Sequence, residues 1–160
     1  MTEQAYTEAV RRNSQRIFLI ALSFTRQRAD AEDVMQNVFL KLWKHGDSLN
    51  GPEHTDKWLT RVTVNECRSL LRFRRDTVSY EEIEAICAAP AAPEEQWLIS
   101  EVLRLPKDQR TAIHLYYYEE LSVREIAELL RVTESAVKKR LSRGRQTLRT
   151  RIKEEKNDET

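Results

Sequence analysis

A cationic segment near the C-terminus places the strongest constraint on how this chain can fold. Val137, Leu141 and Leu148 recur at helical spacing, which predicts a helix with one face against a core. From Lys138 to Lys153, eight Lys and Arg side chains follow one another with no Asp or Glu between them. Like charges at i,i+4 repel each other and weaken an isolated helix. We therefore expect this helix to bind a polyanion such as DNA, with counterion release favouring the complex.

The residues that precede this helix predict a helix-turn-helix over 121–149. Ser122 and Glu125 form an S-x-x-E capping box, which marks the start of a first helix. A short turn follows, and Thr133 is a suitable N-cap for the cationic helix. Two helices joined by three or four residues are typical of this motif. A break at Pro106 separates two further helices that come before the pair.

The outward face of the cationic helix carries side chains that can read base edges. On a helical wheel, at about 100° per residue, these side chains lie opposite the apolar ones. Arg and Lys pair with guanine, Gln with adenine, and Ser with either. The candidate base-reading residues are Ser135, Lys139, Ser142, Arg143 and Gln146, and the candidate phosphate-binding residues beside them are Lys138, Arg140, Arg145 and Arg149. The alternative is a solvated charged face, but such faces usually alternate in sign and this one does not.

The composition favours an all-α fold built from two small helical domains. Gly and Pro are scarce, with 3 and 4 residues, which favours long helices with few tight turns. Apolar residues make up 40% of the chain and charged residues 33%, as in soluble globular proteins. The net charge of +1 conceals an acidic block, because Asp76–Glu101 carries acidic charges only. We expect domains over 1–75 and 94–160, joined by a flexible acidic linker over 76–93.

Three helices are expected in the N-terminal domain, over 7–27, 30–45 and 56–75. The second has an apolar stripe at i, i+1, i+4, i+5, i+8 and i+9, which is a strong amphipathic signal. The stripe consists of Val34, Met35, Val38, Phe39, Leu42 and Trp43. We expect Asp30 as the N-cap of this helix and Asp33 at its third position, where a carboxylate complements the helix dipole.

The sequence indicates no metal site, cofactor, catalytic centre or membrane span. The histidines do not stand at metal-ligand spacing with the cysteines, and no nucleophile–base set or glycine-rich phosphate loop is present. The apolar run 17–24 is too short to span a bilayer and lacks the cleavage site of a signal peptide. The residues considered are His45, His54, His114, Cys67 and Cys87. We expect a cytoplasmic protein that is not an enzyme, with its thiols reduced.

Two motifs together resemble the extracytoplasmic-function (ECF) sigma factors of bacterial RNA polymerase. "DAEDVMQNVFLKLWKH" (30–45), followed by "WLTRVTVNECRSLLRFRRD" (58–76), is similar to the N-terminal domain of that family. "LPKDQRTAIHLYYYEELSVREIAELLRVTESAVKKRLSRGRQTLR" is similar to its C-terminal DNA-binding domain. The resemblance implies a region-2-like domain over 1–75 that binds core RNA polymerase and opens the −10 element. It also implies a region-4-like domain over 94–160 that recognises the −35 element of promoter DNA.

The resemblance assigns the 30–45 helix to docking on core RNA polymerase. The implied contact residues are Asp33, Gln36, Asn37, Phe39, Leu40 and Trp43. Asn37 departs from the family pattern, which usually has Glu there, and so removes one charge from the contact. For Phe39 and Trp43, a role confined to the core is an equally good interpretation.

The resemblance assigns the next helix to the −10 element, where the duplex opens. The implied residues are Asn50, His54, Trp58, Arg61, Asn65, Arg68 and Arg72, with Arg74 and Arg75 as further phosphate contacts. A loop over 49–56 is the candidate pocket for an extruded base. Trp58 could stack on single-stranded bases, although a tryptophan at such a position is more often part of the core.

Two alternatives accompany the resemblance, one for the function of the chain and one for its linker. A helix-turn-helix regulator that acts independently of core polymerase would explain 94–155, but it would leave the motifs of 30–75 to chance. The acidic linker could thread a polymerase channel, as in the family, or could serve only as a solubilising tether. The family also implies an anti-sigma factor as a partner that holds the protein inactive.

Overall fold

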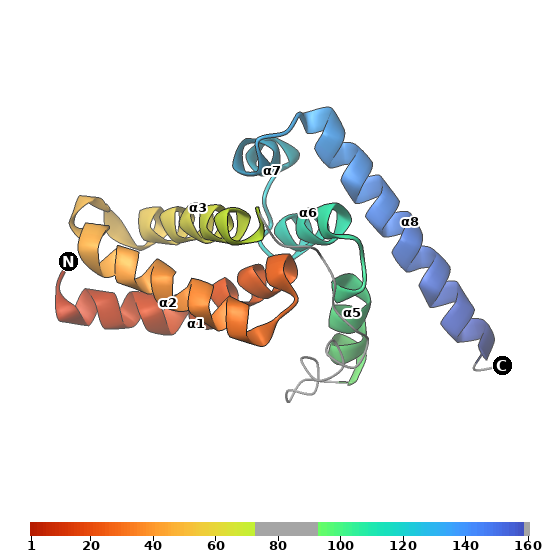
Figure 1. Ribbon diagram of the computed structural model, residues 1–160, viewed down its shortest axis with the longest axis horizontal. Helices are drawn as coiled ribbons and strands as arrows, with labels where there is room; N and C mark the ends of the chain where they lie inside the picture. Colours follow the sequence, from red (N-terminus) through yellow and green to blue (C-terminus); the bar gives the residue numbers. More distant parts are fainter. Residues whose placement is uncertain (73–92, 159–160) are drawn as a thin grey trace. The chain divides into compact units, whose positions relative to one another are not determined.

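The computed structural model describes residues 1–72 and 93–158 of the chain, and the elements in these ranges are all helical. The expected all-α class is therefore confirmed. The chain divides into two units, Met1–Thr77 and Val78–Thr160, which we describe separately (Figure 1). Arg74, Arg75, Cys87 and the expected linker up to residue 92 lie outside the described residues.

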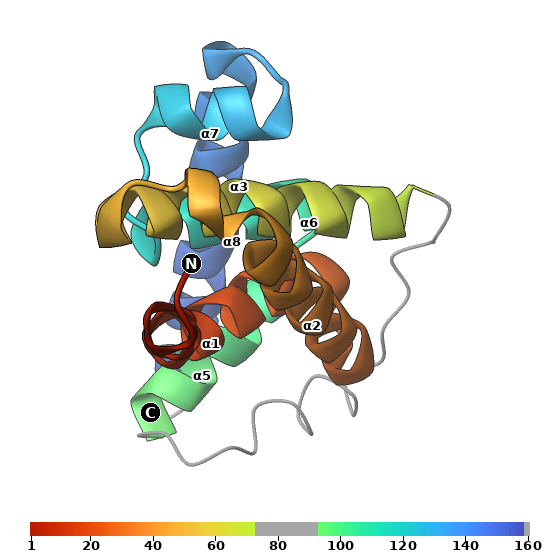
Figure 2. The same cartoon turned by 90° about the vertical axis from the view of Figure 1, so that its left-hand side faces the viewer.

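The first unit is a packed group of three long helices, α1 (Glu3–Thr25), α2 (Arg28–His45) and α3 (Gly51–Leu71). A 3-10 turn, η1 (Gly46–Ser48), links α2 to the segment before α3. Each of the three helices packs against the other two (Figure 2). The shared core is apolar and fully buried, and it includes Ile17, Ile20, Leu42, Leu59 and Val64. Burial of each such side chain contributes about 1.5–3 kcal/mol, which holds the three helices together.

The helix starts in this unit differ from those expected from the sequence. Asp30 is not the N-cap of α2, because the helix begins earlier, at Arg28, and Asp30 lies in its first turn. There its carboxylate still complements the helix dipole. The start of α3 is Gly51 rather than residue 56, with proline in its first turn, where the missing N–H costs nothing. The expectation of a loop over 49–56 is therefore wrong, since residues 51–56 are the first turns of a helix.

The described part of the second unit, residues 93–158, contains four helices, α5 (Pro93–Leu103), α6 (Lys107–Tyr117), α7 (Val123–Leu130) and α8 (Glu134–Asp158). The break at Pro106 is confirmed, because Pro106 is the N-cap of α6. The long helix α8 packs against both α6 and α7 (Figure 1). A buried carboxylate ties α5 to the C-terminal half of α8. Glu101 accepts from Arg104 at 3.0 Å and from Arg151 at 3.3 Å.

A glycine sets how closely α6 and α8 approach each other. Gly144 of α8 is buried, and a Cβ at this position would lie 2.8 Å from Cγ1 of Ile113 on α6. That separation is too short for two carbon atoms, so a larger residue would force the helices apart. The sequence pattern did not single out this residue, because an isolated glycine within a helix carries no fixed meaning.

Candidate functional site

The helix pair of the second unit has the geometry of a helix-turn-helix. The capping box is confirmed, since the Ser122 N–H donates to Glu125 Oε1 and the Glu125 N–H to Ser122 Oγ, both at 3.1 Å. Thr133 caps α8, because its Oγ1 accepts from the Ala136 N–H at 3.0 Å. Between the helices, Arg131 adopts a left-handed conformation with φ 57°. The side-chain bonds satisfy some of the N–H groups that lack an intrahelical partner at the two helix starts.

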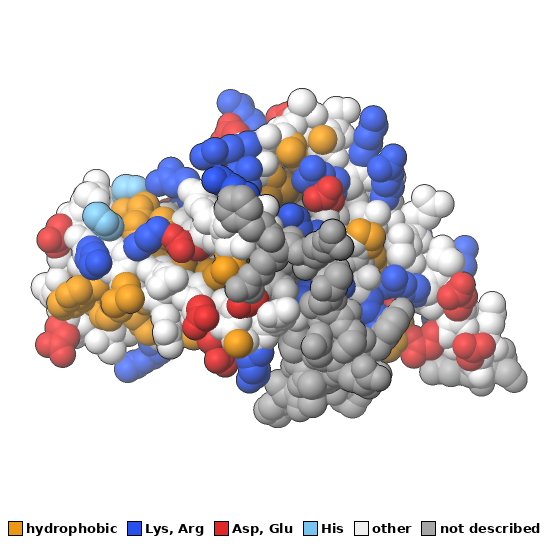
Figure 3. Space-filling model, in the orientation of Figure 1, with side chains coloured by type: hydrophobic (Ala, Val, Ile, Leu, Met, Phe, Trp, Pro, Cys, Tyr) orange, Lys and Arg blue, Asp and Glu red, His pale blue; other side chains and the backbone are white. Residues whose placement is uncertain are grey.

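The outward side of α8 is a continuous polar and cationic surface. Val137 and Leu141 are buried on the inner side of the helix. Seven of the expected DNA-binding residues are exposed on the outer side, and we call this set the α8 outer face: Ser135, Lys138, Lys139, Ser142, Arg143, Gln146 and Arg149. Lys and Arg side chains are visible along α8 in the space-filling view (Figure 3). Ser, Gln, Lys and Arg side chains of this kind can hydrogen-bond base edges or phosphates.

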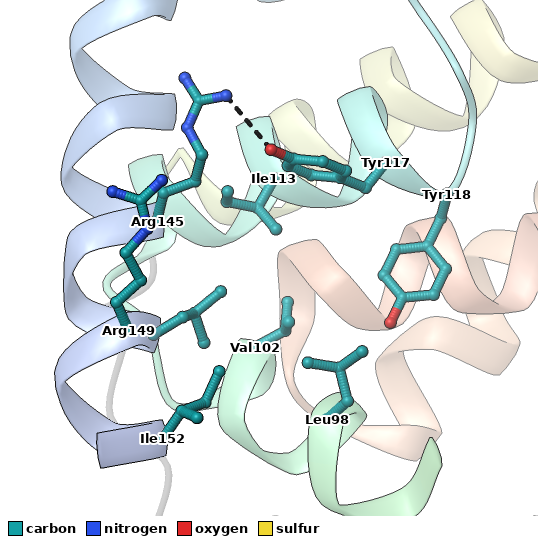
Figure 4. Close-up of a pocket in the computed structure, with 9 residues that line it drawn as sticks. Leu98, Val102, Ile113, Tyr117, Tyr118, Arg145, Arg149 and Ile152 are labelled. Atoms are coloured by element: carbon teal, nitrogen blue, oxygen red, sulfur yellow. Dashed lines mark hydrogen bonds between the residues drawn. The ribbon is translucent and has the colours of Figure 1, made fainter. Parts of the chain in front are cut away.

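Two arginines of the expected set are engaged within the protein instead. Arg140 turns toward α6, with its Nη2 3.9 Å from Asp108 Oδ2. Arg145 donates from Nη1 to the Tyr117 hydroxyl at 3.2 Å. Figure 4 shows this bond beside an apolar groove of about 510 Å³ between α5, α6 and α8. The groove is lined by Leu98, Val102, Ile113, Tyr117, Tyr118, Arg145, Leu148, Arg149 and Ile152.

A second exposed surface follows the outer side of α2. Asp33, Gln36, Asn37, Leu40 and Trp43 are exposed, and at about 100° per residue they share one side of the helix. Leu40 is 56% exposed and Trp43 is 54% exposed, which is unusual for apolar side chains of this size. We call these five residues the α2 outer face, and an exposed apolar patch is visible over this part of the unit (Figure 3).

Phe39 differs from the other expected docking residues. It is 8% exposed and belongs to the core of the first unit. Its carbonyl oxygen accepts a hydrogen bond from the Tyr6 hydroxyl at 3.1 Å. The Tyr6 ring in turn meets the Trp43 indole edge to face, with centroids 5.0 Å apart. Tyr6 therefore fixes an exposed tryptophan, a role that no sequence periodicity indicates because the two residues lie on different helices.

A third surface runs along α3. The expected −10 residues occupy a stripe on one side of the helix, which we call the α3 outer stripe: Asn50, His54, Trp58, Arg61, Asn65, Arg68 and Arg72. The opposite side is buried and includes Leu59, Thr63 and Cys67. The Asn50 N–H donates to His54 Nδ1 at 3.1 Å, so the neutral imidazole carries its proton on Nε2. Trp58 is half-buried.

The remaining thiol and imidazole groups of interest are enclosed. Burial raises the pKa of the Cys67 thiol and keeps it protonated. Burial also lowers the pKa of His114 to about 4, and its ring stacks on Tyr118 with centroids 5.0 Å apart. Among the described residues, no group of three His, Cys, Asp or Glu side chains could hold a metal ion. The same part of the chain has no helix that is long and apolar enough to cross a membrane.

Comparison with known proteins defines the class to which this arrangement belongs. Residues 9–77 match the family described as Sigma-70 region 2, and residues 95–148 match Sigma-70, region 4. The first match spans the unit with the α2 and α3 surfaces, and the second spans the helix-turn-helix unit. The two matches define a transcription initiation factor of the sigma-70 class, which is not an enzyme.

Full-length relatives narrow the class to one family. The ECF RNA polymerase sigma factor SigM of Bacillus subtilis is 30% identical over 151 residues, which cover 89% of this chain and 92% of that protein. The ECF RNA polymerase sigma-E factor of Escherichia coli is 28% identical, covering 95% of each. The chain belongs to the extracytoplasmic-function (ECF) family of RNA polymerase sigma factors. The resemblance in the sequence is thereby confirmed.

One further relative is longer than this chain. The "Probable RNA polymerase sigma factor RfaY" of Xanthomonas campestris is 35% identical over 163 residues. The match covers 94% of this chain but only 41% of that protein.

Solved structures share the fold. CnrH, in complex with the cytosolic domain of CnrY, has a TM-score of 0.63 and 27% identity, covering 95% of this chain and 90% of that one. The sigma factor RpoE of Bartonella quintana, in complex with the anti-sigma factor NepR, has a TM-score of 0.70. At 22% identity, covering 94% of this chain and 98% of that one, this second likeness concerns the fold alone.

Proposed function

We propose that this chain directs core RNA polymerase to promoters through three surfaces with separate tasks. The observation that carries the proposal is the placement of three chemically different outer faces on three different helices. The α2 outer face combines apolar side chains with amides and one carboxylate, the α3 outer stripe is polar and aromatic with arginines, and the α8 outer face is cationic. One macromolecular partner would not require three such surfaces, whereas a polymerase and a promoter together would.

The α2 outer face is the proposed docking surface for core polymerase. Exposed Leu40 and Trp43 supply the apolar anchors that dominate protein interfaces, and Asp33 adds a charge at their edge. Because Tyr6 holds the Trp43 ring in place, less side-chain entropy is lost on binding. Asn37 cannot contribute the charge that the family usually has at this position, so we expect its contact to be a hydrogen bond.

The α3 outer stripe is the proposed contact for the −10 element. Arg68 and Arg72 suit phosphates, while Arg61 and Asn65 can reach the bases of an opened strand. The exposed part of Trp58 can stack on a base, and its buried part anchors the ring. The imidazole of His54 presents Nε2–H as a donor to an acceptor on the DNA.

The α8 outer face is the proposed reader of the −35 element. Arg143 and Gln146 can form bidentate contacts with guanine and adenine in the major groove. Lys138 and Arg149 lie at the edges, where phosphates would run. Arg145 and Arg140 would join them only after leaving Tyr117 and Asp108.

An anti-sigma factor is the proposed inhibitor, and the cytoplasm is the proposed location. A structural relative was solved with an anti-sigma factor bound, and CnrH was solved with the cytosolic domain of CnrY. Exposed apolar side chains in both units, such as Leu40 and Leu98, offer contacts to such a protein. Core polymerase and promoter DNA would place the working protein in the cytoplasm.

Run-off transcription with core polymerase on a genomic promoter library tests the proposal. We expect the chain to confer initiation from a limited set of promoters that core enzyme alone ignores. A pull-down with core polymerase distinguishes the alternative of an independent regulator, which would bind its DNA without the enzyme. Failure to bind core polymerase, or transcripts no more selective than those of core enzyme alone, would contradict the proposed function.

A further inference from the structure

A network of polar side chains fixes the first turns of α3 to α1. Asp56 Oδ1 accepts from Arg12 Nη2 at 2.8 Å and from Asn13 Nδ2 at 3.0 Å. Arg16 donates from Nη2 to Asn13 Oδ1 at 2.7 Å and to the Asp56 carbonyl at 3.0 Å. Arg16 Nη1 also donates to Thr60 Oγ1 at 2.6 Å. We call these five residues the α1–α3 brace.

The brace lies directly behind the DNA-facing side of α3. At about 100° per residue, Asp56 lies about 140–160° around the helix from His54, Trp58 and Arg61, and Thr60 lies one turn further along, close to the same side as Asp56. Asp56 is also only two residues from both His54 and Trp58 in the sequence. Because an α-helix moves as a stiff rod over two turns, anything that fixes Asp56 and Thr60 also fixes the outer residues.

The buried centre of the brace allows only one arrangement. Asn13 is 1% exposed, and its amide is fully engaged. Its Nδ2 donates to the Ala9 carbonyl at 2.9 Å as well as to Asp56, while its Oδ1 accepts from Arg16. A shift of α3 along α1 would leave buried polar atoms without partners, which is costly. The contacts to Asp56 are strengthened by the charges of Arg12 and the carboxylate.

Promoter opening places a load on this part of the helix. A DNA strand bound to the α3 outer stripe must be kept from re-pairing with its complementary strand. The tendency of the two strands to re-pair therefore pulls on α3. If the first turns of α3 could shift relative to α1, binding of the strand would displace the helix and would not keep the bases apart. Apolar packing alone resists sliding poorly, because it is non-directional, whereas hydrogen bonds have fixed partners and angles.

We propose that the α1–α3 brace is a positioning device for promoter opening, in which Asp56 and its partners on α1 hold the outer stripe of α3 fixed while the strands separate. This inference rests on the proposed role of α3 at the −10 element. The brace residues do not contact DNA themselves and act by positioning His54, Trp58 and Arg61.

The test compares initiation on a paired and on a pre-opened promoter. Holoenzyme is assembled from core polymerase and the full chain, and run-off transcription is measured on one promoter as a duplex and as a template with an unpaired −10 region. We expect Asp56→Ala to lower initiation on the duplex by about tenfold while initiation on the pre-opened template stays near wild type. Asp56→Asn keeps an oxygen that can accept from Arg12 and Asn13, and its loss on the duplex should be smaller.

Two further variants separate positioning from general stability. Glu66→Ala removes the Lys41–Glu66 ion pair between α2 and the far half of α3, and it should affect the two templates equally. Arg12→Gln removes only the outer partner of Asp56, so it tests the brace even if Asp56→Ala folds poorly. It should show the same duplex-selective loss on a smaller scale.

Each outcome of this comparison decides one question. An equal effect of Asp56→Ala and Arg12→Gln on both templates, or no effect on either, would overturn the positioning role. The positioning role would also be overturned if Asp56→Asn lowered initiation on the duplex as much as Asp56→Ala does. If wild-type holoenzyme initiates on neither template, the proposed function itself fails, and this result is distinct from failure of the brace.

Discussion

Single residues on α8 are expected to divide into base readers and phosphate binders. Arg143 lies on the central part of the outer face, whereas Lys138 lies at its edge. A base contact changes the preference among sequences, while a phosphate contact weakens binding to all of them. The structure adds that Arg140 and Arg145 each have a partner within the protein, Asp108 and Tyr117.

Arg143→Ala and Lys138→Ala should have different signatures in holoenzyme binding to promoter DNA. Arg143→Ala should cost about 1–3 kcal/mol on the preferred promoter and relax selectivity at one base pair. Lys138→Ala should weaken binding evenly and reduce the salt slope by about one. Binding titrations at several salt concentrations on matched promoter variants measure both effects. An even loss for Arg143→Ala, or a sequence-selective loss for Lys138→Ala, would contradict the assignment.

His114 should make the stability of the second unit depend on pH. Burial lowers its folded-state pKa to about 4 from the ordinary value of 6.5. Well above pH 6.5 the imidazole is neutral in both the folded and the unfolded state, so its full contribution to stability is present. As the pH falls from 6.5 toward 4, the His114 imidazole becomes protonated in the unfolded chain but stays neutral in the folded chain. The free energy of unfolding therefore declines, by roughly 3 kcal/mol at most. Urea unfolding at several pH values should show this decline in wild type and a weaker one in His114→Gln, and identical profiles would contradict the prediction.

At the scale of elements, the sequence predicted the helices better than their ends. The amphipathic stripe located α2, but its start was misplaced because Asp30 is a good N-cap in general while Gln27 occupies that position here without a side-chain bond. The start of α3 was placed too late because Gly51 and Pro52 suggest a turn. In the structure, Gly51 takes φ 83° and the helix begins there. Local propensity does not distinguish a loop from a helix start that uses the same residues.

The crossing of α6 over α8 provides a test of packing at this scale. Gly144→Ala should destabilise the protein by about 1–2 kcal/mol, because the clash with Ile113 outweighs the roughly 1 kcal/mol that alanine gains in helix propensity. Thr150→Ala, at an exposed site on the same helix, is the matched control and should change stability little.

A double variant makes the packing prediction more specific. Ile113→Ala removes the atom that a Cβ at Gly144 would meet, so the two substitutions together should cost less than the sum of their separate effects. Urea unfolding of the four proteins measures the coupling. If the changes in the free energy of unfolding are strictly additive, or if Gly144→Ala alone stabilises the protein, Gly144 is not required for the close approach of α6 and α8.

At the scale of the whole molecule, the all-α class, the family and most exposed candidate residues could be predicted from sequence. Periodicity indicates which side of each helix faces out, and the two motifs are independent. Contacts between distant residues could not be predicted, because nothing local distinguishes Arg145, which bonds Tyr117, from Arg149, which stays exposed. For the same reason the α1–α3 brace, whose partners lie 40 or more residues apart, became visible only in the structure.

Polymerase binding and promoter reading are expected to belong to different surfaces of the chain. Two quantities are measured for wild type, Trp43→Ala and Arg143→Ala. The first is the affinity for core polymerase. The second is the promoter preference of the holoenzyme, at a protein concentration that saturates core polymerase. We predict that Trp43→Ala weakens the affinity by at least about 2 kcal/mol with unchanged preference, and that Arg143→Ala changes the preference with unchanged affinity. A variant that moves both quantities together, or a Trp43→Ala variant that binds core polymerase as wild type does, would contradict the account.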